Sequence, residues 1–301
     1  MQDEDSNLAP DRVDYRSLTK KAADLISPPD VCRRVRILMD DPAATVESIA
    51  QVIECDPGLT GRILKIANSR REAGSDSIES VGEALEQVGV SDVRGMIFAT
   101  VAASTFEQIP EDLVDFDDFW HHSVCCGLAA QVLAGRCRLV HGERLFTAGL
   151  LHDIGQLPIY DQLPDLARRV LDKAGEPEKY RYRAEQEIIG FTHAQVGAEL
   201  MRWWQLPDSL WGPVEFHHEP ARASRFPVET AIIHIATNIA NAIEPSWKTT
   251  GDLDISIRAI NSDVWSVTGL SKDDLEPVLS EVIMRSFDVM ETINPNALNI
   301  Y

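Results

Sequence analysis

The stretch LLHDIGQLP, residues 150–158, places His152 and Asp153 side by side among apolar and small residues. Burying an imidazole next to a carboxylate costs free energy unless both groups find partners. The dyad therefore predicts either a network of buried hydrogen bonds or a site that holds a ligand. The neighbouring segments indicate which side chains can supply such partners.

The segments around this stretch have the apolar periodicity of helices, and none alternates over the length expected of a strand. Four upstream helices are predicted, over residues 45–57, 58–69, 77–89 and 91–104. We expect these helices to begin at N-caps at Thr45 and at Ser77 or Ser80. A break is expected at Asp56-Pro57-Gly58, and the third helix is expected to end at Gly89. We therefore predict an all-α fold.

Prolines and acidic residues at positions 109–118 separate two groups of predicted helices. We expect four regions: a disordered or extended N-terminus (1–14), an N-terminal helical lobe (15–108), a second helical lobe (109–247) and a C-terminal extension (248–301). A last helix over residues 271–293 is expected to lay an apolar stripe back on the body. The stripe consists of Leu275, Val278, Leu279, Val282, Ile283 and Phe287.

The composition is that of a globular chain, with 44% hydrophobic and 25% charged residues among 301. A net charge of −20 disfavours direct binding to nucleic acid or anionic lipid, and no apolar run approaches the roughly 20 residues that span a bilayer. The acidic N-terminus is not a secretory signal, and five cysteines without CxxC spacing favour reduced thiols in the cytoplasm. For the pair Cys125–Cys126, buried thiols are favoured over a redox sensor.

Histidines recur on the apolar faces of four successive predicted helices. Taken singly, each is more often a hydrogen-bonded core residue than a ligand. Taken together, helices of one bundle could bring four histidines and one carboxylate to its axis. These are His122, His152, Asp153, His193 and His217. Neutral imidazoles with a carboxylate suit iron, manganese or zinc, and such a metal could make a nucleophile of a bound water.

In this order, the motifs resemble those of the HDOD family, the HD-related output domains of bacterial signalling proteins. The resemblance covers roughly residues 20–290 and rests on LISPPDVCRRVRILMDDP, RILKIANS, SIESVGEALEQVGV, FWHHS, AGLLHDIGQLP, THAQVGAELMRWWQLP and EFHHEP. It implies that the second lobe is an HD-like bundle related to HD phosphohydrolases and to HD-GYP phosphodiesterases of cyclic di-GMP. It also implies that His122 is the first ligand and His152–Asp153 the signature dyad. His193, His217 and His218 then resemble the additional histidines of the HD-GYP branch.

Three positions depart from the pattern of the enzymes. Thr237 stands where a metal-binding Asp is expected, and a hydroxyl is a poorer ligand for a dication than a carboxylate. Gln156 stands where the HD-GYP branch has Lys, and an amide cannot supply that charge. ARASRF follows HHEP in place of a Gly-Tyr-Pro loop, so the cyclic di-GMP pocket of that branch is not supported.

These departures favour a non-enzymatic signalling module with a degenerate metal site, acting through contacts with a protein partner. In that case the dyad is a relic, held by hydrogen bonds to its neighbours. The alternative is a metal-dependent phosphohydrolase or phosphodiesterase acting on a nucleotide or cyclic dinucleotide, with His152 and Asp153 as catalytic residues. A third possibility is a sensor whose groove binds a nucleotide without cleaving it. The chain is expected to be a stand-alone output domain or part of a longer protein.

Overall fold

In the computed structural model, every regular element of the described residues is a helix, as predicted. The structure describes residues 14–25, 43–54, 78–90, 108–140, 142–174, 180–204, 206–243 and 257–293, with scattered positions between 34 and 106. The helices before the dyad are α1 (Tyr15–Leu25), α3 (Val46–Glu54), α5 (Val81–Val88), α7 (Phe116–Arg136) and α8 (Leu145–Leu150). Those after it are α9 (Gln156–Gln162), α10 (Pro164–Ala174), α11 (Arg181–Ile188), α12 (His193–Trp203), α13 (Asp208–Phe216), α14 (Pro227–Ile243), α16 (Asp263–Thr268) and α17 (Leu275–Ile293).

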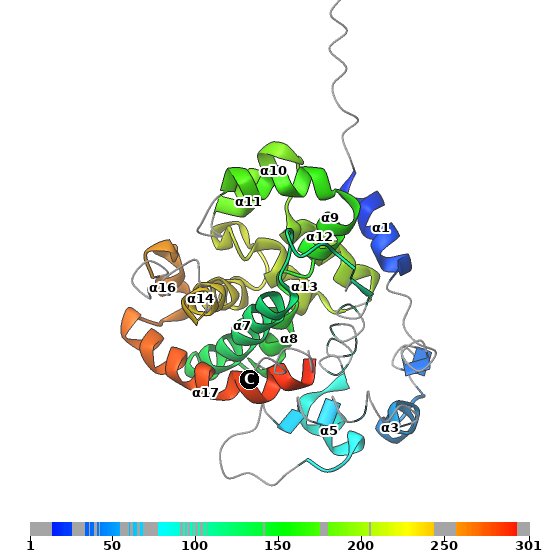
Figure 1. The fold of residues 1–301 in the computed structure, drawn as a ribbon. Coiled ribbons are helices and arrows are strands. Elements are labelled where there is room, and N and C mark those ends of the chain that lie inside the picture. Colours follow the sequence, from blue (N-terminus) through cyan, green and yellow to red (C-terminus); the bar gives the residue numbers. More distant parts are fainter. Residues whose placement is uncertain are drawn as a thin grey trace, which may run out of the picture.

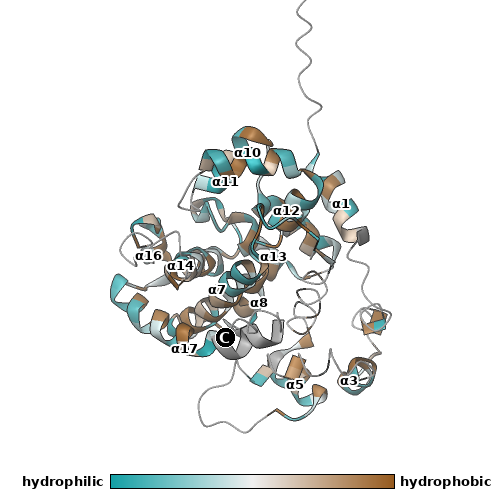
Figure 2. Ribbon diagram, in the orientation of Figure 1, coloured by the Kyte–Doolittle hydropathy of each residue, from teal (hydrophilic) through white to brown (hydrophobic). Residues whose placement is uncertain are grey.

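Helix α7 is the centre of the bundle, and α8, α14 and α17 pack around it (Figure 1). Apolar residues dominate the central helices, whereas α10 and α11 carry many polar residues (Figure 2). Helix α1 packs on α12, while α3 packs on α5 at the opposite end of the molecule (Figure 1). No helix in the described ranges is long and apolar enough to cross a membrane.

Local sequence signals fix several helix ends. Thr45 Oγ1 accepts a hydrogen bond from Ser48 N, and Ser80 forms a capping box with Glu83, so both predicted caps are confirmed. Gly89 ends α5 with φ +92°, a conformation that favours glycine. At α7, the side chain of Asp115 accepts from the amides of Asp117 and Asp118 and so places the start of the helix.

A pair of glycines lets α7 and α8 cross in close contact. A Cβ on Gly149 would lie 2.7 Å from Cα of Gly127, and one on Gly127 would lie 2.8 Å from the carbonyl oxygen of Phe146. Real side chains do not tolerate such distances, so both helices need glycine at the crossing. The crossing brings the N-terminal half of α7 next to the segment that follows α8.

The last helix packs on α7 as expected, with Leu275, Val278 and Val282 buried. The prediction for Ile283 is wrong, because this side chain is 40% exposed: it lies one position past Val282 and turns out of the interface. Phe287 lies outside the residues whose side chains are described. The same holds for the expected break at Asp56-Pro57-Gly58 and for most of the predicted helix over 58–69.

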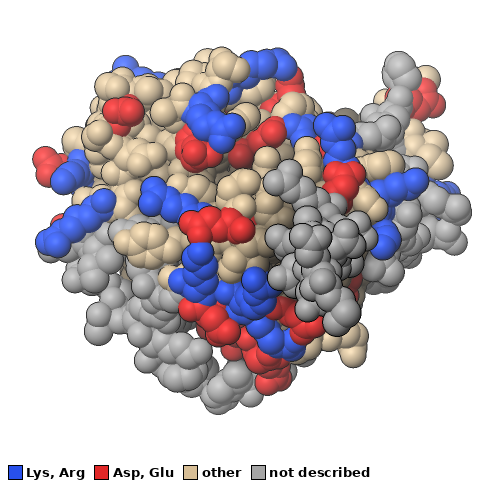
Figure 3. All heavy atoms as spheres, turned by 90° about the horizontal axis from the view of Figure 1, so that it is seen from above, with Lys and Arg blue, Asp and Glu red and all other residues tan. Residues whose placement is uncertain are grey.

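Cys125 and Cys126 are buried thiols, as predicted. On the face seen from above, basic and acidic side chains lie next to one another and do not form a patch of one sign (Figure 3). The predicted regions 1–14, 15–108, 109–247 and 248–301 stay a prediction.

Candidate metal centre

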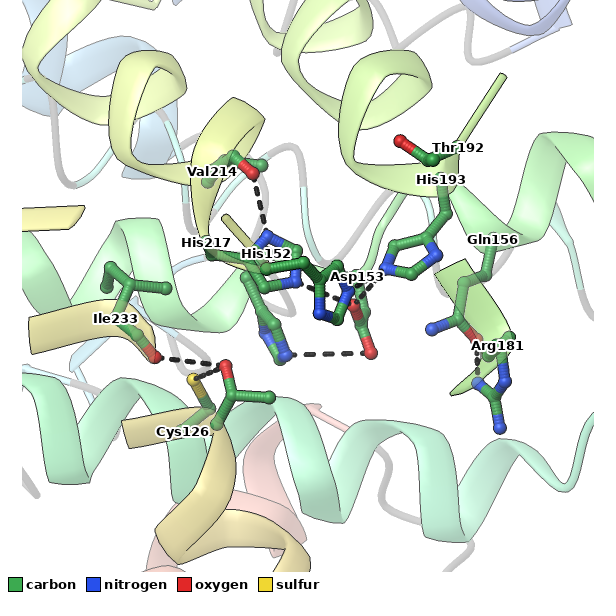
Figure 4. Close-up of polar contacts among 12 residues, drawn as sticks. Cys126, His152, Asp153, Gln156, Arg181, Thr192, His193, Val214, His217 and Ile233 are labelled. Carbon is green, nitrogen blue, oxygen red and sulfur yellow. Dashed lines mark hydrogen bonds and ion pairs between the residues drawn. The ribbon is translucent and has the colours of Figure 1, made fainter. Parts of the chain in front are cut away.

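All six side chains expected from the sequence meet at one place in the bundle, and Figure 4 shows four of them, His152, Asp153, His193 and His217. His122 comes from α7, the dyad from the turn after α8, His193 from the first position of α12, and His217 from the end of α13. His152, His193 and His217 are fully buried. His122 and Asp153 are nearly so, and His218 is partly exposed.

The dyad lies in a turn between α8 and α9. Helix α8 ends at Leu150, and residues 151–155 form turns that lead into α9. A Cβ on Gly155 would lie 2.1 Å from the carbonyl oxygen of His193 and 2.4 Å from the amide nitrogen of Gly197. Gly155 is therefore required because the turn lies directly on α12, which puts Asp153 beside His193.

Asp153 is shared between two sets of ligand atoms. Its Oδ2 lies 3.5 Å from Nε2 of His152 and 3.8 Å from Nε2 of His122, and these residues form the three-ligand group. Its Oδ1 lies 3.1 Å from Nε2 of His193 and 3.7 Å from Nε2 of His217. Together with His218 they form the four-ligand group, and within each group the ligand atoms lie within 4.8 Å of one another.

Hydrogen bonds on the outer side of the rings decide which nitrogen faces the centre. Nδ1 of His152 donates to the carbonyl of Gly149, and Nδ1 of His217 donates to that of Val214, both at 2.7 Å. A neutral imidazole that donates through Nδ1 keeps a lone pair on Nε2. Both Nε2 atoms therefore present lone pairs to the centre, the arrangement found in metal-ligating histidines.

Two buried polar atoms of the centre lack suitable hydrogen bonds within the described chain. Nε2 of His217 has no such partner, and Oδ1 of Asp153 lacks hydrogen-bond geometry despite its contact with His193. Leaving buried polar atoms unsatisfied costs roughly 1–3 kcal/mol each. A cation between these atoms would satisfy both, so the residues present fit a metal ion.

Burial and neighbouring charges set the protonation states of the centre. Burial lowers the pKa of His152 to about 4 and lowers the pKa values of His217 and His218 well below their usual range. Burial alone would raise the pKa of Asp153, but His152 and His193 hold it well below its ordinary value. At neutral pH the centre therefore offers an ionised carboxylate on Asp153 and neutral imidazoles on His152, His217 and His218, the forms that bind metals.

Glu185 on α11 lies behind His193 in the candidate centre, a contact that the sequence did not predict. Its carboxylate is buried, accepts from Nδ1 of His193 at 2.8 Å and also accepts from the backbone amide of His193. Burial would lower the pKa of His193, but the carboxylates of Glu185 and Asp153 outweigh it and raise that pKa to about 10. The only signal in the sequence is an acid eight residues before a predicted ligand, across the turn at Gly190.

The two substituted positions make different contacts. Thr237 is buried on α14, where its hydroxyl donates to the carbonyl of Ile233 and lies 3.7 Å from Sγ of Cys126. Gln156 is also buried, and its Oε1 accepts from the guanidinium of Arg181 at 2.7 Å (Figure 4). A cation from α11 thus stands beside the position at which the sequence lacks a lysine.

A helical bundle that gathers histidines around a His-Asp dyad defines an HD-like protein. The HDOD domain family matches residues 25–220 of the chain, and the chain belongs to this family. An uncharacterised protein of Treponema pallidum (strain Nichols) is 21% identical over 205 residues. That match covers 67% of this chain and 39% of the relative, so the chain spans about two fifths of that protein's length.

Two solved structures share the fold. One is a protein of Shewanella amazonensis SB2B, provisionally described as a phosphohydrolase, with a TM-score of 0.68, 20% identity, and coverage of 92% of this chain and 98% of that one. The other is a protein of Marinobacter aquaeolei VT8, provisionally described as a signal transduction protein, with a TM-score of 0.60 and 18% identity over 95% of this chain and 67% of that one. At these identities the likeness concerns the fold alone, and it confirms the predicted all-α, HD-like class.

Proposed function

We propose that this protein is a regulatory HDOD domain of a bacterial signalling system, acts through contacts with a protein partner, and holds a metal ion at the His/Asp centre. The observation that supports a bound metal ion is the convergence of six predicted side chains around the shared carboxylate of Asp153. Two buried ligand atoms of this set have no hydrogen bond in the described chain. Iron, manganese or zinc suits this set of imidazole and carboxylate donors.

The support for regulation over turnover comes from position 237. The four-ligand group is complete in the described residues, but the three-ligand group has no carboxylate besides Asp153. Thr237 directs its hydroxyl to a backbone carbonyl.

A metal at this centre would supply Lewis acidity and an acidified water. Asp153 would provide the negative charge, and Glu185 would orient His193 and raise its basicity.

Metal analysis of protein purified without a histidine tag tests the first part of the proposal. We expect close to one equivalent of iron, manganese or zinc per chain, retained through gel filtration. Protein with only traces of metal, and no uptake from added Mn²⁺, Fe²⁺ or Zn²⁺, would contradict it.

Metal-dependent hydrolysis of a phosphoester is the second candidate. The carboxylate shared between two ligand groups favours it, since two metals about 3.5–4 Å apart can stabilise both oxygens of an in-line displacement. Arg181 beside Gln156 adds a cation near the centre.

An assay with bis(p-nitrophenyl) phosphate and cyclic dinucleotides separates the two candidates. We expect no turnover above that of Asp153→Ala in metal-loaded protein. Rapid, Asp153-dependent hydrolysis would replace the regulatory proposal with the enzymatic one. Thr237→Asp sharpens the test, because an added carboxylate is expected to increase metal uptake only if position 237 limits the three-ligand group.

A further inference from the structure

A polar cavity of about 260 Å³ lies against the outer side of the candidate metal centre. Its walls come from α11, the end of α13, α14 and the segment just before α16. His217 and His218 of the four-ligand group line it together with Tyr182, Arg183, Asn238 and Arg258. The cavity thus connects the ligand group to solvent.

The lining carries positive charge and no acid, although the chain has 48 acidic and 28 basic residues. The described arginines elsewhere include many in ion pairs, such as Arg144 with Glu229 and Arg168 with Asp112. Within the described residues, Arg183 and Arg258 form none; the side chain of Arg183 donates to the hydroxyl of Tyr182. Glu219, outside the lining, interacts favourably with Arg183, but no carboxylate lines the cavity itself, so its two guanidinium groups favour an anionic ligand.

The C-terminal extension is tied to the centre by a chain of hydrogen bonds. The backbone amide of Asn261 donates to Nε2 of His234 at 3.1 Å, and Nδ1 of His234 donates to the carbonyl of His217 at 2.7 Å. Helix α16 also packs on α14. Arg258 and Asn261 lie beyond residue 220, where the family match ends.

We infer that this cavity binds the phosphate group of a small phosphorylated ligand, of the size of a nucleoside monophosphate, and that the C-terminal extension supplies part of the site through Arg258. The inference rests on the proposed metal centre, because His217 and His218 of that centre line the cavity. It gives the extension a role in choosing the ligand to which the regulatory domain responds.

The chemistry of the lining favours this ligand class. Guanidinium groups donate paired hydrogen bonds to phosphate oxygens, and the side-chain amides of Asn238 and Asn241 can accept from or donate to a sugar or base. Tyr182 stacks flat on His218, with ring centroids 4.7 Å apart, which holds an aromatic wall beside the floor. Sites for larger ligands measure roughly 300–1,000 Å³, so a single nucleotide fits the space better than a dinucleotide.

Isothermal titration of the full chain with AMP, inorganic phosphate and adenosine tests the inference. We expect AMP and phosphate to bind and adenosine to fail. Arg183→Gln and Arg258→Gln should each weaken AMP binding by about tenfold to a hundredfold, as expected for losing a hydrogen bond to a charged group. The matched control is Arg169→Gln on α10, which removes the same charge from an exposed residue outside the cavity and should leave the affinity unchanged.

Metal content, measured on the same samples, separates this inference from the proposed function. Normal metal content with no binding of AMP or phosphate overturns the cavity inference and leaves the metal centre standing. Equal weakening by Arg169→Gln and Arg258→Gln also overturns it, because binding then follows net charge. Binding that depends on Arg183 and Arg258 in protein without metal supports the cavity and contradicts the metal centre.

Discussion

The two ligand groups that meet at Asp153 differ in how the chain holds them. In the four-ligand group, the buried carboxylate of Glu185 fixes His193 through both its ring and its backbone amide. In the three-ligand group, His152 donates to the neutral carbonyl of Gly149, and Thr237 occupies the position at which the family resemblance implies an acid. Carboxylates behind a histidine orient the ring and raise its basicity. We therefore expect the four-ligand group to bind metal first and more tightly.

The largest expected effect comes from removing the shared carboxylate. Asp153→Ala should weaken metal binding to both groups by about a hundredfold or more, because direct ligands contribute at least as much as their supporting residues. The metal-free protein should also lose roughly 1–3 kcal/mol of unfolding free energy, since His193 loses a charged neighbour. Elemental analysis and urea unfolding measure the two effects. Asp165→Ala, an exposed acid on α10, is the control; equal losses from both variants would contradict a role for Asp153.

The next largest expected effect is a loss of metal affinity in the four-ligand group but not in the three-ligand group. Glu185→Gln should weaken the first equivalent of metal by about 10–100-fold and leave the three-ligand group intact. Glu187→Gln on the same helix changes an exposed carboxylate paired with Lys173 and should have no effect on metal. A competition titration with a chelating dye measures the metal affinities of both variants. If Glu185→Gln binds metal as tightly as the native chain, the difference between the groups does not come from this carboxylate.

Substitutions at the histidine pair of α7, His121 and His122, test the three-ligand group, which we expect to bind metal less tightly. His122→Ala should abolish any second equivalent of metal while leaving the first in place, because His122 is buried and belongs only to the three-ligand group. His121→Ala should leave metal binding as in the native chain, since its ring lies near Cys125, outside both groups. Spectroscopic titration with Co²⁺ counts the equivalents. Loss of the first equivalent in His122→Ala would show that the order of binding is reversed.

The smallest effect is a change of stability with pH in metal-free protein. His152, with a pKa lowered to about 4, and His217, with a pKa far below its usual value, are neutral in the folded state. They bind more protons when unfolded, so their contribution to stability is lost as pH falls below about 6.5. His193, with its pKa raised to about 10, contributes stability that is present below about pH 6.5 and is lost as pH rises toward 10.

Thermal unfolding between pH 4.5 and 9.5 should therefore show a maximum near pH 6.5. Glu185→Gln should reduce the fall in melting temperature above pH 6.5 and leave the fall below pH 6.5 unchanged. The reason is that, among His152, His193 and His217, Glu185 raises the pKa of His193 alone. A curve that keeps its alkaline slope in this variant would contradict the link between Glu185 and His193.

Short-range signals in the sequence were enough to predict much of the fold and to name the candidate metal ligands. Thr45, Ser80 and Thr192 cap helices through contacts three residues away, so each can be recognised from a few neighbouring letters. The six converging side chains were named from helical faces and from the family resemblance. Their metal binding and their roles stay a prediction.

Contacts between distant segments could not be predicted in the same way. Glu185 reaches His193 across a turn, and the end of α8 at Leu150 depends on Gly155 lying against α12. Arg258 and His217 line one cavity although 41 positions separate them in the sequence. Neither a repeat nor a periodicity connects such residues, because the bundle packing alone brings them together.

A single carboxylate that faces both ligand groups makes their occupancies interdependent. A cation accepted on the Oδ1 side withdraws negative charge from Oδ2, so the second cation meets a less favourable potential. By linkage, the penalty acts equally in the reverse order of filling. The centre would then respond to metal over a concentration range broader than that of a single independent site, which suits graded regulation better than an on-off response.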